Sequence, residues 1–139
     1  MDFWPDDGQG ARQVSRFIAA LDRSVDRYGQ DVILRRTVGT ANRASIDCPC
    51  RASVRNYDPT QLAGTIQQGD SQVVLSPTDI DRVQWPGPEP IQSPPRATDP
   101  RIPRVTDVVV IGGRSRSVVA SVPFVVNGEL VRVELQVRG

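Results

Sequence analysis

The residues best suited to chemistry are two cysteines, Cys48 and Cys50, separated by Pro49. A structural zinc site needs four ligands, and this chain has 2 cysteines and no histidine. A redox pair uses the C-x-x-C spacing, one residue longer than the spacing here, at a helix N-terminus that lowers the thiol pKa. Both cysteines also share the apolar parity of an alternating segment. We therefore predict two small core residues, with no metal and no cofactor.

Acidic residues offer the next candidates, as the pairs Asp6-Asp7 and Asp79/Asp81. Either pair could bind a hard cation weakly, but isolated carboxylate pairs on loops are usually solvated. The absence of histidine removes the commonest general base and triad member. Gly112-Gly113 leads into a strand pattern and not into the helix N-terminus that a phosphate loop needs. We therefore predict that the chain is not an enzyme.

The length of the chain predicts a single domain, and its small net charge predicts no strong electrostatic field. The chain has 139 residues and a formal net charge of +1, and all 17 of its basic residues are arginine. Either a G+C-rich genome or a need for bidentate contacts to carboxylates or phosphates explains the arginine bias. No apolar run is long enough to span a bilayer, and the N-terminus is acidic where a signal peptide is basic. We expect a protein made and kept in the cytoplasm, or in a particle assembled there.

The first strong structural pattern is an amphipathic helix over residues 11–28, after a flexible arm at residues 1–10. Its apolar stripe consists of Val14, Phe17, Ile18, Leu21, Val25 and Tyr28. The other face is charged, either as a solvated surface or as one that meets a charged partner. Interface candidates on it are Arg12, Arg16, Arg23 and Arg27. In the arm, Phe3 and Trp4 either fold back onto the domain or dock into a neighbouring subunit.

The rest of the chain has strand patterns. Alternating or apolar runs predict strands over residues 31–37, 45–55, 72–75, 108–111, 118–122 and 131–137. Asn127-Gly128 predicts a hairpin turn, because both residues tolerate the positive φ of a type I′ turn. Ser76-Pro77 predicts a helical turn through Val83. Pro49 predicts that its strand is an edge or is bulged there.

A proline-rich segment covers residues 86–103, with seven prolines in eighteen residues. Such a long structureless loop is either functional or a solvated excursion between two strands. Both interpretations stay open for this segment.

The order of these elements, with several short motifs, resembles one known family. The motifs are Asp31-Val-Ile-Leu-Arg-Arg36, Val54-Arg-Asn-Tyr-Asp-Pro59, Gln61-Leu-Ala-Gly64, Ile66-Gln-Gln-Gly-Asp70, Val73-Val-Leu-Ser-Pro77, Thr106-Asp-Val-Val-Val-Ile-Gly112 and Leu135-Gln-Val-Arg-Gly139. Together they resemble the small head–tail joining proteins of tailed bacteriophages, also called head completion, neck or stopper proteins. The resemblance covers most of residues 11–139.

This resemblance implies a mainly β fold: a small antiparallel β-barrel with an N-terminal amphipathic helix and long loops. It implies a structural virion protein that forms a ring, a hexamer or alternatively a dodecamer, below the portal and its adaptor. The ring retains packaged double-stranded DNA and docks the tail terminator or tail tube. A loop projects into the channel in stopper-like relatives, and the candidates here are 37–44, 56–70 and the proline segment.

The candidate contact residues follow from this expectation. Subunit or partner contacts are assigned to Phe3, Trp4, Arg12, Arg16, Arg23, Arg27, Trp85, Arg132 and Arg138. Channel-loop candidates are Asn56, Tyr57, Gln67, Gln68 and Asp70. In the last strand, the apolar parity Val131, Val133, Leu135 and Val137 should face the barrel interior beside the cysteines. The other parity should form a surface between ring neighbours.

Two alternatives remain. The chain could be another part of the same connector, namely a tail terminator, a tail completion protein or the adaptor. It could also be a small nucleic-acid-binding barrel, which requires six arginines to converge on one face: Arg35, Arg36, Arg51, Arg55, Arg114 and Arg116. The small net charge and the few aromatic residues count against this second alternative.

Overall fold

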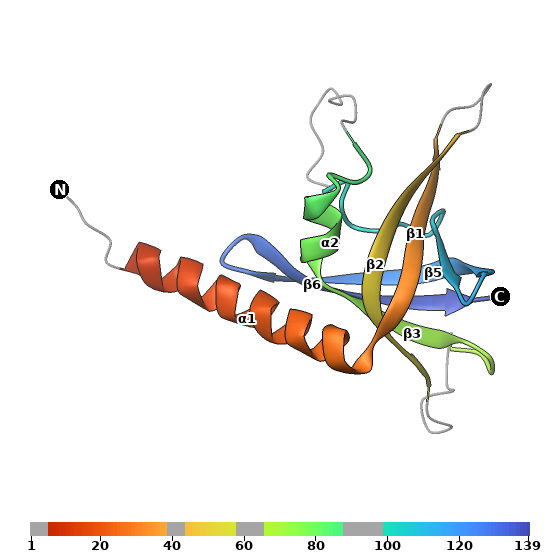
Figure 1. Cartoon of the computed structure of the whole chain (residues 1–139), viewed down its shortest axis with the longest axis horizontal. Coiled ribbons are helices and arrows are strands. Elements are labelled where there is room, and N and C mark those ends of the chain that lie inside the picture. Colours follow the sequence, from red (N-terminus) through yellow and green to blue (C-terminus); the bar gives the residue numbers. More distant parts are fainter. Residues whose placement is uncertain (1–5, 39–43, 58–65, 88–98) are drawn as a thin grey trace.

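Six strands close into an antiparallel barrel in the order β1-β2-β3-β6-β5-β4 (Figure 1). The computed structural model describes residues 6–38, 44–57, 66–87 and 99–139. The strands are β1 Gln30–Val38, β2 Ala44–Asn56, β3 Ser71–Leu75, β4 Val108–Ile111, β5 Arg114–Val126 and β6 Glu129–Arg138. The helices are α1 Asp6–Tyr28 and α2 Pro77–Arg82. The predicted fold class, a small antiparallel β-barrel with an N-terminal helix, is confirmed.

The core fills the barrel with small and medium aliphatic side chains. Val133, Leu135 and Val137 of β6 are buried in one cluster with Cys48 and Cys50. The predicted interior parity of β6 is therefore confirmed for these three residues. Val131 is also buried but lies outside that cluster, because the β5–β6 register shifts between Phe124 and Val125.

The turns follow the sequence signals closely. Asn127 and Gly128 both have positive φ, 51° and 78°, as a type I′ hairpin turn requires. Ser76 caps α2 by accepting a hydrogen bond from the backbone N–H of Thr78, and Pro77 begins the helix. Both predictions are confirmed.

Pro49 lies where β2 has a single partner strand. It faces Ile33 in β1, whereas the pairing of β2 with β3 begins only at Ala52. The strand is thus a local edge at Pro49, which tolerates a residue that cannot donate a backbone hydrogen bond. The predicted edge is confirmed.

Helix α1 begins at Asp6, five residues before the predicted start. The prediction of a flexible arm over residues 1–10 is therefore wrong for residues 6–10. The helix includes Gly8 and Gly10, although glycine in a helix interior costs about 1 kcal/mol relative to alanine.

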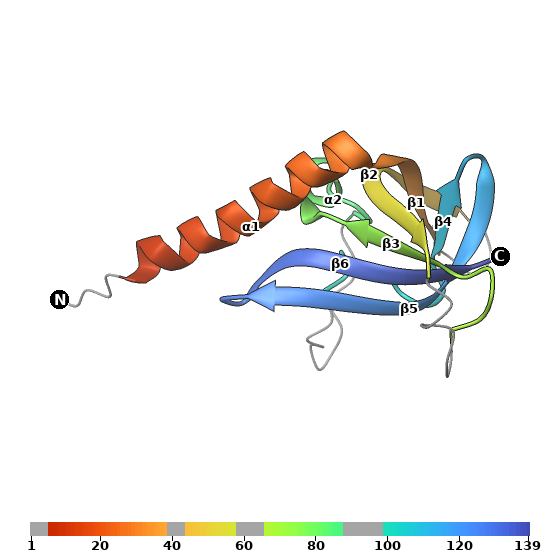
Figure 2. The same cartoon turned by 90° about the horizontal axis from the view of Figure 1, so that it is seen from below.

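Two elements extend together beyond the barrel (Figure 2). One is α1, and the other is the far end of the β5–β6 hairpin. Strand β4 pairs with β5 only as far as Ser117, and β3 pairs with β6 only from Val133. The intervening hairpin therefore has only its own two strands. We call residues 13–24 of α1 and residues 122–132 of this hairpin the wing.

Candidate functional site

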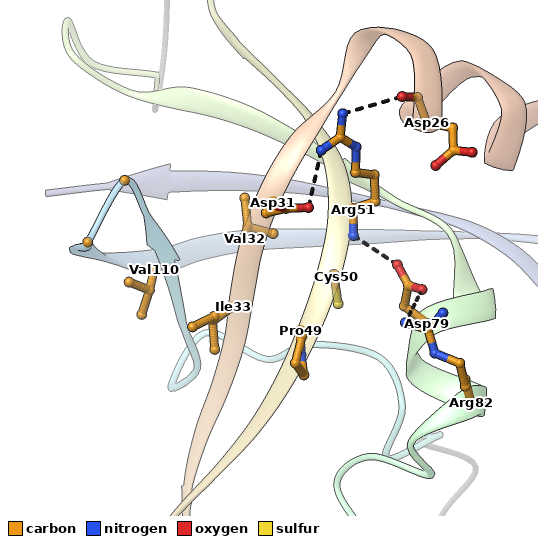
Figure 3. Close-up of a pocket in the computed structure, with 12 residues that line it drawn as sticks. Asp26, Asp31, Val32, Ile33, Pro49, Cys50, Arg51, Asp79, Arg82 and Val110 are labelled. Atoms are coloured by element: carbon orange, nitrogen blue, oxygen red, sulfur yellow. Dashed lines mark hydrogen bonds and ion pairs between the residues drawn. The ribbon is translucent and has the colours of Figure 1, made fainter.

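A polar pocket of about 650 Å³ lies where the end of α1 meets β1, β2, α2 and the β4–β5 turn (Figure 3). Its charged side chains are Asp26, Asp31, Arg51, Asp79 and Arg82. The neighbouring strands contribute Ile33, Pro49 and Cys50 to its wall. Because it combines carboxylates, guanidinium groups and a thiol, this pocket is the main candidate for an active site among the described residues.

Arg51 ties the C-terminal end of α1 to the barrel. Its guanidinium donates to the backbone carbonyl of Val25 at 3.1 Å and to that of Asp26 at 3.3 Å. It also donates to the carboxylate of Asp31 at 3.1 Å. A cation on the last carbonyls of a helix satisfies orphan acceptors and opposes the helix dipole. Arg51 thus holds the helix in position.

The carboxylate of Asp79 also makes its contacts within the protein. One carboxylate oxygen accepts from the backbone N–H of Arg51 at 2.8 Å, and the other pairs with Arg82 at 2.8 Å. Asp81 pairs with Arg101 at 2.8 Å. Within the described residues, no group of three or more His, Cys, Asp or Glu side chains is placed to hold a metal ion. In this pocket, the hydrogen bonds of Arg51 to α1 and to Asp79 hold both helices on the barrel.

The two cysteine thiols lie 3.5 Å apart, and both are buried. The hydrogen bond between them lowers the pKa of Cys48 and raises the pKa of Cys50, and burial opposes the first shift and adds to the second. Cys48 is completely buried, so its thiolate has no path to a reagent in the folded protein. The prediction of two buried core residues is confirmed.

Trp85, predicted as an interface residue, belongs to the interior instead. Its ring is buried, its indole N–H donates to the carbonyl of Ile46 at 2.9 Å, and Arg36 lies 4.4 Å above it. Arg36 makes a two-pronged ion pair with Asp107, with both distances 2.9 Å. The interface prediction for Trp85 is wrong, because this cluster anchors the chain that follows the proline-rich segment.

Asp70, predicted in a channel loop, is also internal. Its carboxylate accepts from Arg138 at 2.9 and 3.0 Å, from Gln136 at 2.8 Å and from the backbone of Gln67 at 2.9 Å. These contacts hold the pKa of Asp70 well below its usual range, with the Arg138 hydrogen bond the largest cause. The channel prediction for Asp70 is wrong, because its side chain fixes the turn before β3.

The partners of Asp70 qualify the predicted outer surface of β6. Gln136 is buried, and the guanidinium of Arg138 is held by Asp70. Arg132 remains half-exposed and pairs with Glu134 at 2.7 Å. The outer parity is thus partly exposed at Arg132 and Glu134, and forms an internal clamp at Gln136 and Arg138.

The remaining predicted residues lie at two separate places. Arg16, Arg23 and Arg27 are exposed along α1, whereas Gln67 and Gln68 are exposed at the turn before β3. Near that turn, Asn56 accepts a hydrogen bond from Ser71 at 3.2 Å, and burial raises the pKa of Tyr57. Phe3, Trp4 and the side chain of Arg12 lie outside the described residues, as do 39–43, 58–65 and 88–98 of the predicted channel loops.

The six arginines of the nucleic-acid alternative do not form one open face. Arg36 is buried, Arg35 pairs with Asp47 at 2.8 Å, and Arg51 pairs with Asp31. Arg55 donates to Gln72 and Arg116 to Ser71, and Arg114 donates to the carbonyl of Gly139. The nucleic-acid alternative requires these guanidinium groups to converge on one open face, but the described ones bind neighbours within the barrel.

Sequence reasoning missed the apolar surface of the wing. Val122, Phe124 and Val125 are exposed on the β5–β6 hairpin, and Phe17 is exposed on α1. The signal was present as five consecutive apolar residues, 122–126, where a strand with one wet face should alternate. Such a run indicates that both faces of the hairpin end need a cover.

Comparison with known proteins gives no relative from which to assign a function. No protein-family model matches the chain, and no curated protein matches it. Neither described helix is long and apolar enough to cross a membrane. The site must therefore be interpreted from its own residues.

Proposed function

We propose that this chain is a structural protein of a tailed-phage neck, a head–tail connector of the stopper type. Copies form a ring, a hexamer or alternatively a dodecamer, below the portal and adaptor. The ring retains packaged DNA and docks the tail terminator or tail tube. The protein resides in the virion and performs no catalysis. The other connector parts, namely adaptor, tail terminator and tail completion protein, remain alternatives within the same role.

The observation that carries this proposal is a contrast between two regions. Most charged groups of the pocket contact the protein itself, whereas large apolar side chains of the wing are exposed. Four of the five charged side chains of the polar pocket form two ion pairs, Arg51 with Asp31 and Arg82 with Asp79, which suits a structural role. The wing, by contrast, exposes large apolar side chains on two projecting elements. Exposed apolar patches of this kind mark interaction surfaces.

The charge balance also suits a ring through which DNA passes. The formal net charge is only +1. A strongly basic channel lining would bind the DNA backbone by counterion release and hold it, whereas a near-neutral lining lets it slide. Near-neutral copies also repel one another little when they assemble. Gln67 and Gln68, exposed at the turn before β3, are the described residues that best fit a channel-facing loop.

Imaging of purified virions tests the proposal. We expect density at the neck that accommodates the six-stranded barrel with α1 directed toward a neighbouring copy. A neck fully occupied by other chains, with none of this one, contradicts the proposal. In the same phage, deletion of the gene should give filled heads that lose DNA and lack tails.

Complementation supplies the matched control for that deletion. The wild-type chain and the exposed-pair variant Asp47→Asn should both restore infectious particles, because the Asp47 side chain lies at the surface. The core variant Val133→Asp should not. Particles that form normally without the chain would overturn the proposed role.

A further inference from the structure

An open apolar cleft of about 660 Å³ separates α1 from the β5–β6 hairpin. On the helix it is lined by Phe17, Ala20, Leu21 and Ser24, and on the hairpin by Phe124, Val126, Val131, Arg132 and Glu134. The side chains that line it are mostly apolar, and its charged residues lie on the hairpin side, where Arg132 pairs with Glu134. The cleft thus has an apolar floor and a charged rim.

Helix α1 buries less of its apolar stripe than an amphipathic pattern predicts. Of the six residues in its apolar stripe, only Val25 is buried, whereas Phe17 is 48% exposed and Tyr28 is 76% exposed. A helix gains most of its stability in a protein by packing its apolar face. Val14, Ile18 and Leu21 are half-buried, so the stripe is only partly covered within the described residues of one chain.

The β5–β6 hairpin on the other side of the cleft also exposes apolar side chains. Phe124, which lines the cleft, is 41% exposed, on a ribbon that has only two strands at this point. Two-stranded ribbons are marginally stable alone. Both walls of the cleft would gain stability from an apolar occupant.

The chain itself carries a segment with the right chemistry. Phe3 and Trp4 stand just before α1, flanked by Asp2, Asp6 and Asp7. Two aromatic rings fit an apolar floor, and aromatic anchors in a pocket dominate many interfaces. The acidic flanks complement Arg132, the arginine that lines the cleft.

The two rings cannot fill the cleft of their own chain. Helix geometry places Ala20 about 21 Å from Asp6 along the axis, at 1.5 Å per residue. The three residues from Phe3 to Asp6 span at most about 10 Å when fully extended. Even with the length of a side chain added, the rings fall short of the centre of their own cleft.

We propose that Phe3 and Trp4 of one copy insert into the cleft between α1 and the β5–β6 hairpin of a second copy. The contact is head-to-tail, since the donor segment and the acceptor cleft are different surfaces. Repeated around an axis, a contact of this type closes into a ring. The inference rests on the proposed ring and deepens it by naming the contact that joins neighbouring copies.

Disulfide trapping in the full-length chain tests the contact. The variant Asp2→Cys/Ala20→Cys keeps both rings and places one thiol beside them and one in the cleft. The matched control is Asp2→Cys/Ala19→Cys, because Ala19 is equally exposed but does not line the cleft and points about 100° away around the helix. Cys48 and Cys50 are buried and contribute little background.

We expect the Ala20 variant to form intermolecular cross-links roughly tenfold faster than the Ala19 control at high protein concentration, because docking raises the local thiol concentration. Adding Trp4→Ala should return the rate to that of the control. Equal rates for both variants, or a disulfide within one chain, overturn the inference.

The same variants separate this inference from the proposed function. Specific cross-linking in a chain that virion imaging does not find at the neck refutes the function and leaves the contact. A chain found at the neck that cross-links equally through Ala19 and Ala20 refutes the contact and leaves the function.

Discussion

The barrel and the wing of this molecule differ in how fully they bury their apolar and charged side chains. In the barrel, Val73, Leu75 and Val133 are completely buried, and even a charged pair, Arg36 and Asp107, is enclosed. In the wing, Phe17 is 48% exposed and Phe124 is 41% exposed. The barrel thus buries its own apolar side chains, whereas the wing leaves large apolar side chains exposed. We expect the wing to gain stability when a partner covers it.

The largest difference should appear when the same carboxylate is introduced into each region. Val133→Asp places a charge in the closed core and should cost more than about 4 kcal/mol, enough to unfold a marginal domain. Val125→Asp on the exposed hairpin should change the free energy of unfolding by less than about 0.5 kcal/mol. Circular dichroism and urea unfolding measure both. Equal losses would remove the distinction between barrel and wing.

The next largest effect concerns the enclosed ion pair. Asp107→Ala leaves Arg36 buried without its carboxylate partner and should cost about 3–5 kcal/mol. The matched change at an exposed pair, Asp81→Ala beside Arg101, should cost less than about 1 kcal/mol. Thermal unfolding of the two variants side by side decides whether the barrel depends on its interior charges.

The clamp at Asp70 should appear in the pH dependence of stability. Its pKa is depressed in the folded state, chiefly by the hydrogen bond from Arg138. A depressed carboxyl pKa contributes stability that is fully present above the unfolded value, about 3.9, and is lost as pH falls below it. Unfolding midpoints in urea between pH 7 and pH 2 should therefore fall less steeply in Asp70→Asn than in the wild type. Parallel curves would show that Asp70 contributes no such clamp.

The smallest effect on folding is expected at the rim of the wing. Arg132→Ala removes a half-exposed pair with Glu134 and the contact of Arg132 with the Phe124 ring. The free energy of unfolding should change by less than about 1 kcal/mol. Assembly, measured as incorporation into particles, should weaken more than stability does. A variant that assembles normally but unfolds readily would reverse the roles given to the two regions.

The sequence predicted what local patterns control. Alternation from Val131 to Val137 located a strand with a buried face, and Asn127-Gly128 located its hairpin turn. The shared parity of Cys48 and Cys50 with the apolar residues of β2 correctly placed both thiols inside. These features depend on neighbours in the chain, so a single sequence contains their signal.

Features made by distant residues escaped prediction. Arg36 and Asp107 are 71 residues apart, and Asp70 and Arg138 are 68 apart. Nothing local shows that these charges meet, so Asp70 and Arg138 were assigned to contacts with other molecules. Trp85 precedes the proline-rich segment without a periodic pattern around it, and its burial follows from the way Ile46 and Arg36 enclose its ring.

The exposed surface of the wing was predicted only in part. The arginines of α1 are exposed as expected, but the apolar hairpin opposite them was not identified. An apolar stripe on a helix predicts burial without saying in which molecule. Only the structure shows that Phe17 and Tyr28 of this stripe stay exposed among the described residues.

Amide hydrogen exchange, compared between the isolated chain and purified phage particles, tests the central claim most directly. In the isolated chain, β1, β2, β3 and residues 133–137 of β6 should exchange slowly, and the wing should exchange much faster. In particles, the wing should become as protected as the barrel. A wing that is already as slow as the barrel in the isolated chain, or that stays fast in particles, would contradict the account.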